Sequence, residues 1–403
     1  MLLNRTGTKP LWQKGGTGLA IAILMGLMLV LNGCSLPQVS AEERIFLNLS
    51  LEFLDEYQVA PTATVADTPV RGLSALTYDR QNDRFYVLSD DRSERSPARF
   101  YTMKLVLDSS NPEQVGIADA VFENVTVLSQ ANGEPYTAGT IDPEGIALSP
   151  RQSVFISSEG IPSQNWPPFV NEYDLETGRL QNSLPIPTRY LPNEVDEQPV
   201  GVQENLGFEA LTLNPGGFSP NWLEPFRLFT ATESSLHQDR TIAPPDDESA
   251  SARIRLLHYL VGEDVPTLIS EHAYLLDPDP DGAIANGLTE LVVLDQGGHF
   301  LSLERAFGWT GIRARIYQIA TGGATDTSSI PSLGGDISGI TPIRKRLLLD
   351  LADLDLPLDN LEGMTLGPQL PDGSYSLILV SDDNFNDAQF TQLLLFRLRG
   401  LPG

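Results

Sequence analysis

The sequence predicts an all-β fold of the β-propeller type, and three observations support this prediction. A two-part pattern recurs five times after residue 70: an apolar run with a polar or acidic residue near its start, then a second apolar run that ends in an acid. The runs are rich in Val, Ile, Leu, Phe and Tyr and are separated by Gly, Pro, Asn and Asp, which is typical of short strands. No stretch sustains an apolar stripe with helical spacing over three turns.

The spacing of the repeats indicates the architecture. The paired runs are GLSALTYD and FYVLSDD, PEGIALSP and VFISSEG, GFEALTLNP and RLFTATES, GLTELVVLD and HFLSLER, and LEGMTLGP and SLILVSDD. The polar residues near the starts of the first runs are Ser74, Glu144, Glu209, Thr289 and Glu362, so the spacings are 70, 65, 80 and 73 residues. Four-stranded sheets arranged radially, with loops, fit a period of this length. We expect six blades, one of them degenerate and within residues 306–355, although only five repeats are visible and five to seven blades agree with the length.

The N-terminus has the layout of a secretory signal peptide. Arg5, Lys9 and Lys14 precede thirteen largely apolar residues that end at Leu31, and Leu31-Asn32-Gly33-Cys34 resembles a bacterial lipobox, in which the cysteine is lipidated before cleavage. A spanning helix needs roughly 20 apolar residues, so an uncleaved anchor is the less favoured alternative. We therefore expect a signal peptide over residues 1–33, lipidated Cys34 with a tether over residues 34–44, and one propeller domain over residues 45–403.

This reading places the protein in a bacterial cell envelope. Ser35 follows the cysteine where an Asp would retain a lipoprotein at the inner membrane, so we expect a lipid anchor in the outer membrane, with the domain facing the periplasm or the exterior. Cys34 is the only cysteine, so the mature domain depends on its core rather than on disulfides.

Charge narrows the range of partners. Without the three basic residues of the leader, 23 Lys and Arg stand against 53 Asp and Glu, a balance of 23 − 53 = −30. Such a field disfavours nucleic acid and anionic membrane surfaces. We expect a monomer that acts on a small molecule and meets the membrane only through its lipid.

The repeated acids are the candidate functional residues, because the first strands of propeller blades line one central channel. Equivalent acids therefore converge, and like charges about 4 Å apart repel by about 4 kcal/mol at an effective dielectric constant near 20. The candidate metal ligands are Asp90, Glu144, Glu159, Glu233, Glu362, Asp382 and Asp383.

Two compensations for this repulsion remain open. Each acid can accept backbone N–H bonds from a neighbouring blade. Alternatively, the acids bind divalent cations, above all Ca²⁺, which takes six to eight oxygen ligands in flexible geometry. Asp277, Asp279, Asp281 and Gly282 add a D-x-D-x-D-G string of calcium-loop type, although Leu288 stands where such a loop needs a bidentate Glu.

Most common catalytic motifs are missing. The sequence has no G-x-S-x-G, H-E-x-x-H, P-loop or dinucleotide-binding glycine string, and its four histidines lack metal-ligand spacing. If the protein is a hydrolase, water bound to a metal is the most economical nucleophile.

Several motifs resemble the phytase-like family that is described as having "esterase-like activity of phytase". They are Asp142-Pro143-Glu144-Gly145, Gly207-Phe208-Glu209-Ala210-Leu211, Leu303-Glu304-Arg305, Asn360-Leu361-Glu362-Gly363 and Ser381-Asp382-Asp383-Asn384-Phe385. The resemblance extends from about Gly72 to the C-terminus, and it implies a secreted bacterial β-propeller that hydrolyses phosphoesters or other esters.

The mechanism we expect places Ca²⁺ at an acidic mouth of the channel. Metal-bound water would attack phosphorus, Glu209 or Glu304 would accept a proton, and Arg305, with Arg92, would clamp oxygens. Arg305 could instead only pair with Glu304. Two other functions stay open: a non-catalytic envelope propeller that binds a peptide, glycan or protein, and a calcium-dependent lactonase.

Overall fold

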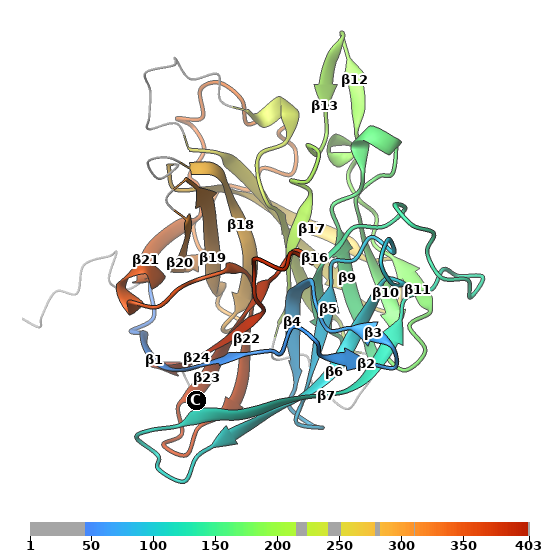
Figure 1. The fold of residues 1–403 in the computed structure, drawn as a ribbon. Coiled ribbons are helices and arrows are strands. Elements are labelled where there is room, and N and C mark those ends of the chain that lie inside the picture. Colours follow the sequence, from blue (N-terminus) through green and yellow to red (C-terminus); the bar gives the residue numbers. More distant parts are fainter. Residues whose placement is uncertain (1–44, 215–223, 241–250, 279–282, 310, 402–403) are drawn as a thin grey trace, which may run out of the picture. The chain divides into compact units, whose positions relative to one another are not determined.

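Five four-stranded antiparallel sheets form the fold (Figure 1). The computed structural model describes residues 45–214, 224–240, 251–278, 283–309 and 311–401. The predicted signal peptide, Cys34 and the tether lie outside the described residues. Within the described part, no helix has the length and apolar character needed to span a membrane. The all-β prediction is confirmed, since the only helices described are short 3₁₀ turns.

Each sheet is one blade, numbered here in chain order. Blade 1 is β4 (Leu73–Asp79), β5 (Arg84–Ser89), β6 (Arg99–Asp108) and β7 (Gly116–Val127); blade 2 is β8 (Pro143–Leu148), β9 (Ser153–Ser158), β10 (Phe169–Asp174) and β11 (Leu180–Ser183). Blade 3 is β14 (Phe208–Leu213), β15 (Phe226–Thr232), β16 (Arg253–Val261) and β17 (Thr267–Leu275); blade 4 is β18 (Ala283–Val293), β19 (His299–Gly308), β20 (Gly311–Ala320) and β21 (Arg344–Asp350). Blade 5 is β22 (Asn360–Gln369), β23 (Tyr375–Asp382), β24 (Gln392–Arg399) and the N-terminal strand β1 (Ser50–Gln58).

The first strands of the blades close a ring in the order β4, β8, β14, β18, β22 and back to β4. The ring is locked because β1 pairs with β24, from Ser50 opposite Arg399 to Gln58 opposite Gln392, so the first and last described strands share one sheet. In Figure 1 the blue β1 lies beside the red β24. Closure of this kind removes long exposed edges, which would otherwise invite aggregation.

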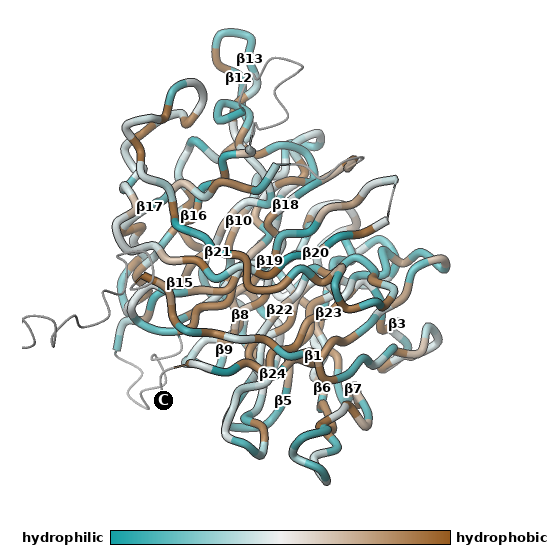
Figure 2. The backbone as a smooth tube through the Cα atoms, turned by 90° about the vertical axis from the view of Figure 1, so that its left-hand side faces the viewer, coloured by the Kyte–Doolittle hydropathy of each residue, from teal (hydrophilic) through white to brown (hydrophobic). Residues whose placement is uncertain are grey.

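The apolar core is divided into five layers, one between each pair of neighbouring blades. Successive side chains of a strand point to opposite faces of its sheet, and each face is covered by a different neighbouring blade. This explains the division of the core into layers. Figure 2 shows the resulting apolar stretches along the sheet strands and the hydrophilic loops outside them. Since no single layer dominates, each blade depends on both of its neighbours.

The propeller has five blades rather than the expected six. The segment expected to hold a degenerate blade contains the end of β19, β20, β21 and the 3₁₀ turn η5 (Leu351–Leu354). Between β20 and β21 the chain runs along the outer edge of blade 3: the Thr327 N–H donates to the Glu271 carbonyl, and the Ile343 N–H donates to the Ala273 carbonyl. This segment therefore covers an edge strand and does not form a sixth sheet.

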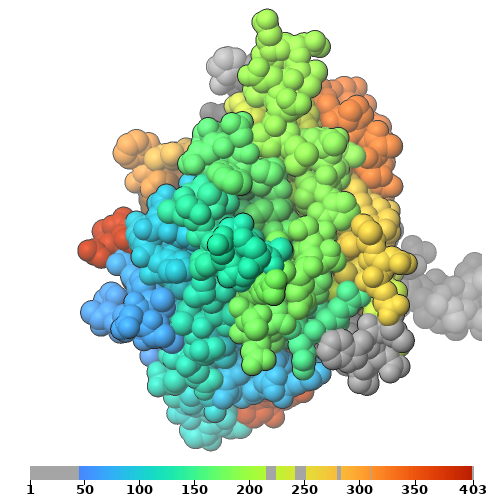
Figure 3. Space-filling model, turned by 90° about the vertical axis from the view of Figure 1, so that its right-hand side faces the viewer, coloured from blue at the N-terminus to red at the C-terminus, as the bar shows by residue number. Residues whose placement is uncertain are grey.

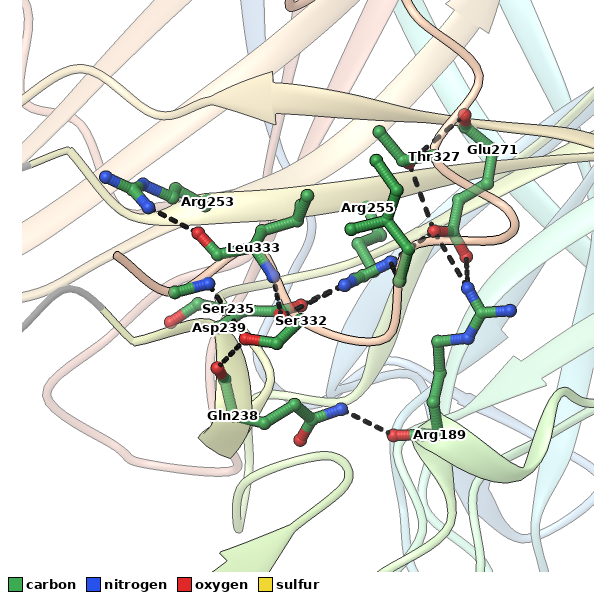
Figure 4. A network of polar contacts seen from close by, with 12 residues as sticks. Arg189, Ser235, Gln238, Asp239, Arg253, Arg255, Glu271, Thr327, Ser332 and Leu333 are labelled. Carbon is green, nitrogen blue, oxygen red and sulfur yellow. Dashed lines mark hydrogen bonds and ion pairs between the residues drawn. The ribbon is translucent and has the colours of Figure 1, made fainter. Parts of the chain in front are cut away.

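A buried set of charges fixes this edge. We call Arg189, Asp239, Arg255 and Glu271 the blade-3 ion-pair network (Figure 4). Arg255 pairs with Asp239 at 2.5 Å and with Glu271 at 2.5 Å, and all three side chains are completely buried. Arg189 Nη1 lies 3.3 Å from Glu271 Oε1. The network joins β16 and β17 to the 3₁₀ turns η2 (Thr188–Tyr190) and η4 (His237–Asp239).

Backbone and hydroxyl groups complete the network. The Leu333 N–H donates to Asp239 at 2.6 Å, the Thr327 hydroxyl donates to Glu271 at 3.1 Å, and the Tyr190 hydroxyl donates to Glu271 at 2.7 Å. The network thus ties the edge-covering segment and two inter-strand connections to blade 3.

Two short hairpins complete the described strands: β2 (Thr64–Val65) with β3 (Thr68–Pro69), and β12 (Asn193–Val195) with β13 (Gln198–Val200). The second lies in the connection from blade 2 to blade 3 and is almost entirely exposed. It forms the light-green projection at the top of Figure 3.

Candidate active site at the acidic mouth of the channel

Each first strand carries one extra residue that interrupts its pairing with the second strand. The pairing shifts between Leu73 and Ala75 in β4, with the same irregularity at the equivalent place in the other four blades. The residues at these five β-bulges include Ser74, Glu144, Glu209, Thr289 and Glu362. A bulge re-aims its side chain. The polar residue near the start of each repeat is therefore the one that the backbone turns toward the channel.

A second ring follows from the register of the second strands. Leu73 is opposite Ser89 and Leu288 is opposite Glu304, and the three other pairs are equivalent. The residues one position further along the second strands are Asp90, Glu159, Glu233, Arg305 and Asp382. Blade 4 thus places a cation where the other four blades place an acid.

All members of both rings except Ser74 and Thr289 line one cavity of about 290 Å³ at one mouth of the channel, which we call the acid well. Ten acids and three arginines line it, with two Asn and one Phe. The lining residues are Asp90, Asp91, Arg92, Glu94, Arg95, Asp142, Glu144, Glu159, Asn205, Glu209, Glu233, Arg305, Glu362, Asp382, Asn384 and Phe385. No described His or Cys lines the well, so the donors that the structure describes are hard oxygen ligands of the kind that suit Ca²⁺, Mg²⁺ or Mn²⁺.

Two arginines neutralise part of this charge. Arg305 Nη2 lies 2.9 Å from Glu362 and 3.4 Å from Glu233. Its Nε is buried and has no hydrogen-bond partner among the described residues. Arg92 grips Asp142 through two bonds, of 2.6 and 2.5 Å.

Three carboxylates in the middle of the well have no arginine partner: Glu144, Glu159 and Glu209. Three sets of carboxylate oxygens lie within 4.8 Å of one another, and each of these three glutamates belongs to two of the sets. The sets are Asp142–Glu144–Glu159, Glu144–Glu209–Glu362 and Glu159–Glu209–Glu233. Glu159 accepts one bond, from the Gly207 N–H at 2.7 Å. Glu209 is only 6 % exposed, and among the described residues nothing donates a hydrogen bond to its carboxylate.

The environment opposes ionisation of these acids. Burial raises the pKa of Glu209, and repulsion from Glu233 raises it further. Burial and the charge of Glu209 likewise hold the pKa of Glu144 well above its usual value. Burial raises the pKa of Asp142 to about 6 and that of Glu362 to about 7, despite their arginine partners. The chain itself therefore supplies too little positive charge for all of these acids to ionise, and a divalent cation would supply the difference.

Glu304 does not join the other predicted site residues. Its carboxylate accepts a bond from Lys345 Nζ at 2.5 Å and another from the Tyr274 hydroxyl, and it borders a separate small cavity with Asp277. The prediction counted Glu304 as the acid that ends the fourth repeat, whereas the register assigns that place to Arg305. Successive residues of a strand point to opposite faces, so an error of one residue moves the side chain out of the channel.

The paired acids at the ends of β5 and β23 divide their roles. Asp90 and Asp382 line the acid well, and Asp90 Oδ1 is buried and has no hydrogen-bond partner in the part of the chain that the structure describes. Asp383 is not free to bind a metal as predicted, because it pairs with Arg71 at 2.8 Å and accepts the N–H groups of Gly72 and Phe385, each at 3.0 Å. Asp91, in turn, is paired with buried Arg99 at 2.9 Å. The second acid of each pair therefore builds a loop.

Some site residues were not singled out by their own pattern. Asp142, Asn205 and Arg95 come from connections between strands rather than from the repeated runs, so no periodic signal marks them. Glu290, next to Thr289, is buried and accepts the Leu211 and Leu291 N–H groups at 3.2 and 2.9 Å, as the backbone-clamp alternative expected.

In the calcium-loop string, Asp279, Asp281 and Gly282 lie outside the described residues. Its described member, Asp277, pairs with Lys345 at 2.5 Å and accepts the Tyr317 hydroxyl at 2.5 Å. Asp277 is thus engaged in the same cluster as Glu304, away from the acid well.

The opposite mouth of the channel is apolar. A cavity of about 230 Å³ there is lined by the far ends of all five first strands, including Leu76, Leu148, Leu213, Val293 and Leu366. Among the described residues, the carboxylates of the channel therefore gather at the mouth where the first strands begin.

Comparison with solved structures finds distant likenesses. The calcium-binding protein regucalcin from Agrobacterium tumefaciens shares 11 % identity, with 86 % of this chain and 96 % of that chain covered and a TM-score of 0.34. The catalytic domain of a GH62 α-L-arabinofuranosidase from Coprinopsis cinerea also shares 11 % identity, over 87 % of this chain and 97 % of that one, with a TM-score of 0.41. The Dos1 propeller shares 8 % identity, over 82 % and 68 %, with a TM-score of 0.33. Likeness at this level carries no information on activity.

A search of curated protein sequences finds no match. A family profile, in contrast, matches residues 68–385, which include all five bulges and both rings of the acid well. The chain therefore belongs to the phytase-like family, whose description is "esterase-like activity of phytase".

Proposed function

We propose that the acid well binds a divalent cation, Ca²⁺ by its donor set, and that the protein hydrolyses an ester bond of a substrate held at this mouth. The observation that carries the proposal is Glu209: a carboxylate 94 % buried that belongs to two of the three oxygen sets and accepts no hydrogen bond from any described residue. A buried charge without a partner is costly, and proteins retain such groups mainly at functional sites. The family description, which names an esterase-like activity, supports the reaction class.

The residues fit a cation of this kind. Asp142, Glu144 and Glu159 all come from blade 2 and offer oxygens within 4.8 Å of one another. Several oxygens from carboxylates, with water completing the shell, is the usual environment of Ca²⁺. When bound, the cation would neutralise the well and polarise a phosphoryl or carbonyl oxygen of the substrate.

The neighbouring blades supply the other groups. Glu209, on blade 3, has a raised pKa and no competing donor, so it suits the role of proton acceptor from the attacking water. Arg305, on blade 4, is held by Glu233 and Glu362 through Nη2 and lines the well, so its guanidinium suits an anionic oxygen of the substrate. Glu233 and Glu362 then act as anchors of Arg305 as well as members of the acid rings. This division assigns no part in the reaction to Glu304.

The reaction class is tested with the purified protein on phosphomonoesters, carboxylic esters and lactones, with Ca²⁺ and with a chelator. We expect hydrolysis of a phosphomonoester or carboxylic ester that requires the cation. Turnover of lactones alone would favour the lactonase alternative. No turnover on any panel, together with measurable calcium binding, would favour a non-catalytic binding propeller and overturn the proposed reaction.

The role of Glu209 is tested by Glu209→Gln against Glu304→Gln. Both changes replace a buried glutamate by its amide, but only the first lies in the acid well. Removing a general base typically lowers kcat by about 10²- to 10⁴-fold. We expect a loss of this size in the first variant and near-normal kcat in the second, once both are shown to be folded by circular dichroism. Equal losses would mean that Glu209 is not the proton acceptor.

Placement at the envelope is a separate proposal that rests on the sequence of residues 1–44 alone. Labelling of growing bacteria with a fatty-acid probe should mark the natural protein and not a Cys34→Ala variant. A label that persists in the variant would contradict lipidation at this residue.

A further inference from the structure

We propose that Arg95, stacked on Phe385 at the rim of the acid well, binds a second oxyanion of the substrate, remote from the ester that is cleaved. The inference rests on the proposed function, because the well must hold the other end of the same molecule. Three arginines line the well, and two of them, Arg92 and Arg305, pair with acids. Arg95 alone has neither an ion pair nor a side-chain hydrogen bond within the described residues, although ten acids line the same cavity. Its guanidinium carbon lies 4.4 Å from the centroid of the Phe385 ring instead.

The loop that carries Arg95 is fixed by Asp91. The carboxylate of Asp91 accepts the N–H groups of Glu94, Arg95 and Ser96 at 2.9, 3.1 and 2.8 Å. Asp91 is itself held by its ion pair with Arg99, in which both side chains are completely buried. The position of Arg95 on the rim is thus set by the backbone, independently of its own side chain.

The loop that carries Phe385 is fixed in the same way from blade 5. Asp382 accepts the Asn384 N–H at 2.8 Å, and Asp383 accepts the Phe385 N–H at 3.0 Å. Asn384 and Phe385 have φ angles of +49° and +51°. A bulky residue rarely adopts the left-handed region, and such strain persists where the surroundings impose it, most often at functional sites.

Gly72 makes room for the aromatic ring. A Cβ at this position would lie 2.2 Å from Phe385 Cε2 and 2.3 Å from Asp90 Oδ1, and Gly72 has φ +63°. Only glycine allows this approach and this backbone conformation together. Phe385 is therefore seated against the backbone of Gly72, and Arg95 stacks on its ring.

This arrangement suits an anion. A guanidinium stacked on an aromatic face keeps its N–H groups at its edge, where they can form two parallel bonds to a carboxylate or a phosphate. Because the ring restrains the side chain beforehand, less conformational freedom is lost on binding. The cation-loaded well and the rim would then hold two anionic groups of one ligand, which defines the substrate as an ester with an additional phosphate or carboxylate.

The test uses non-hydrolysable ligands and the calcium-saturated protein. Alkylphosphonates of increasing chain length are prepared in three forms, ending in a methyl, a carboxylate or a phosphonate group, and their affinities are measured by isothermal titration calorimetry. At one or more lengths we expect an anionic end to improve affinity about tenfold or more over the methyl end, in keeping with a charge-assisted bidentate bond. The carboxylate and phosphonate arms show which oxyanion the rim prefers.

Variants assign the effect to the rim. Arg95→Gln should reduce the affinity ratio to near 1, Arg95→Lys should keep part of it, and Phe385→Leu should lower it because the stacking is lost. The control is Arg80→Gln, which removes an exposed arginine at the apolar mouth and should leave the ratio unchanged. A ratio that survives in Arg95→Gln would overturn the inference.

The two proposals fail in different ways. Equal affinity for methyl and anionic ends at every length would overturn the inference while leaving the proposed function standing. No binding of any phosphonate would overturn the inference and exclude a phosphoester substrate, whereas the reaction on carboxylic esters is tested by the hydrolysis assay itself. With ester substrates, Arg95→Gln should raise KM for those with a remote anion and change kcat little, whereas an equal fall in kcat for all esters would contradict a recognition role.

Discussion

The acid well and the blade-3 ion-pair network are both buried and both rich in carboxylates, yet they differ in charge balance. In the network, two arginines meet two acids, and each acid also accepts bonds from backbone or hydroxyl groups. In the well, ten acids meet three arginines, one of which pairs with no acid among the described residues. The same residue types thus have two roles. A cluster whose charges balance holds segments together, and a cluster with an excess of acids can bind a cationic ligand.

The two regions also differ in how the chain builds them. The network joins 3₁₀ turns, β16, β17 and an edge-covering segment, all around one blade. The well repeats one backbone device, the bulge, in all five first strands. A repeated device gathers like charges around an axis, and the repetition is broken by Ser74 in blade 1 and by Thr289 and Arg305 in blade 4.

The largest effect should come from breaking the balanced cluster. Arg255→Met leaves Asp239 and Glu271 buried with less compensation, and removal of one partner of a buried ion pair typically costs about 3–5 kcal/mol. We expect a loss of this size in the free energy of unfolding, measured by urea titration with circular dichroism. The matched control, Arg80→Met, alters an exposed arginine and should change stability by less than about 0.5 kcal/mol. If both variants unfold at the same urea concentration, the network does not stabilise the fold.

Calcium should stabilise through the unbalanced cluster alone. A ligand that binds only the folded state at about 100 times its Kd adds about 2.7 kcal/mol. When calcium replaces the chelator, we expect the free energy of unfolding, measured by urea titration, to rise by an amount of this order. The rise should be much smaller in Glu144→Gln, which removes a member of two oxygen sets. Arg255→Met should keep the calcium shift although it starts from a lower stability. A calcium shift that is unchanged in Glu144→Gln would place the cation elsewhere.

The sequence predicted the well better than the network, for a physical reason. Glu144, Glu209 and Glu362 were found because each occupies the same place in a repeated strand pair, and the bulges turn these places to one axis. Asp239, Arg255 and Glu271 come together only through the path of residues 321–343 along blade 3. No repeat in the sequence marks this path. The same path explains the overestimated blade count, since strand-like composition does not reveal which edge a segment will cover.

The error at Glu304 has a different origin. Composition identified an acid at the end of the fourth repeat, but only the pairing of Leu288 with Glu304 shows that Arg305 is the residue that faces the channel. Loop residues such as Arg95 and Asp142 were not predicted as site residues for a third reason: the sequence of a connection between strands has no periodic pattern. Position within a strand could thus be predicted only where the hydrophobic pattern fixed the register.

The metal-free well should make stability depend on pH. Burial raises the pKa of Glu362 to about 7 and that of Asp142 to about 6, whereas such carboxyls titrate near pH 4 in an unfolded chain. Between these values the folded state binds more protons than the unfolded state, so stability is greatest at the acidic end and falls as the pH rises, by about 1.4 kcal/mol per pH unit for each such carboxyl.

The measurement is the urea midpoint in chelator between about pH 5.5 and pH 8, repeated with saturating calcium. Calcium should flatten or reverse the slope, because the cation favours the ionised carboxylates. A metal-free protein whose stability rises over the same range would show that these carboxyls are already compensated within the chain.

The smallest effect on the free energy of unfolding should come from Glu209→Gln, and it should have the opposite sign to the effect of the matched substitution Asp239→Asn. Without metal, Glu209→Gln removes a charge from a crowded set of acids and should stabilise the fold by about 1 kcal/mol, a modest gain because the raised pKa already leaves Glu209 partly protonated. Asp239→Asn removes a charge that is paired with Arg255 and should destabilise. Urea unfolding in chelator compares the two directly. If both variants lose stability, Glu209 is held by donors that the chain itself supplies. The contrast between a balanced and an unbalanced cluster would then be wrong for the residue on which it depends most.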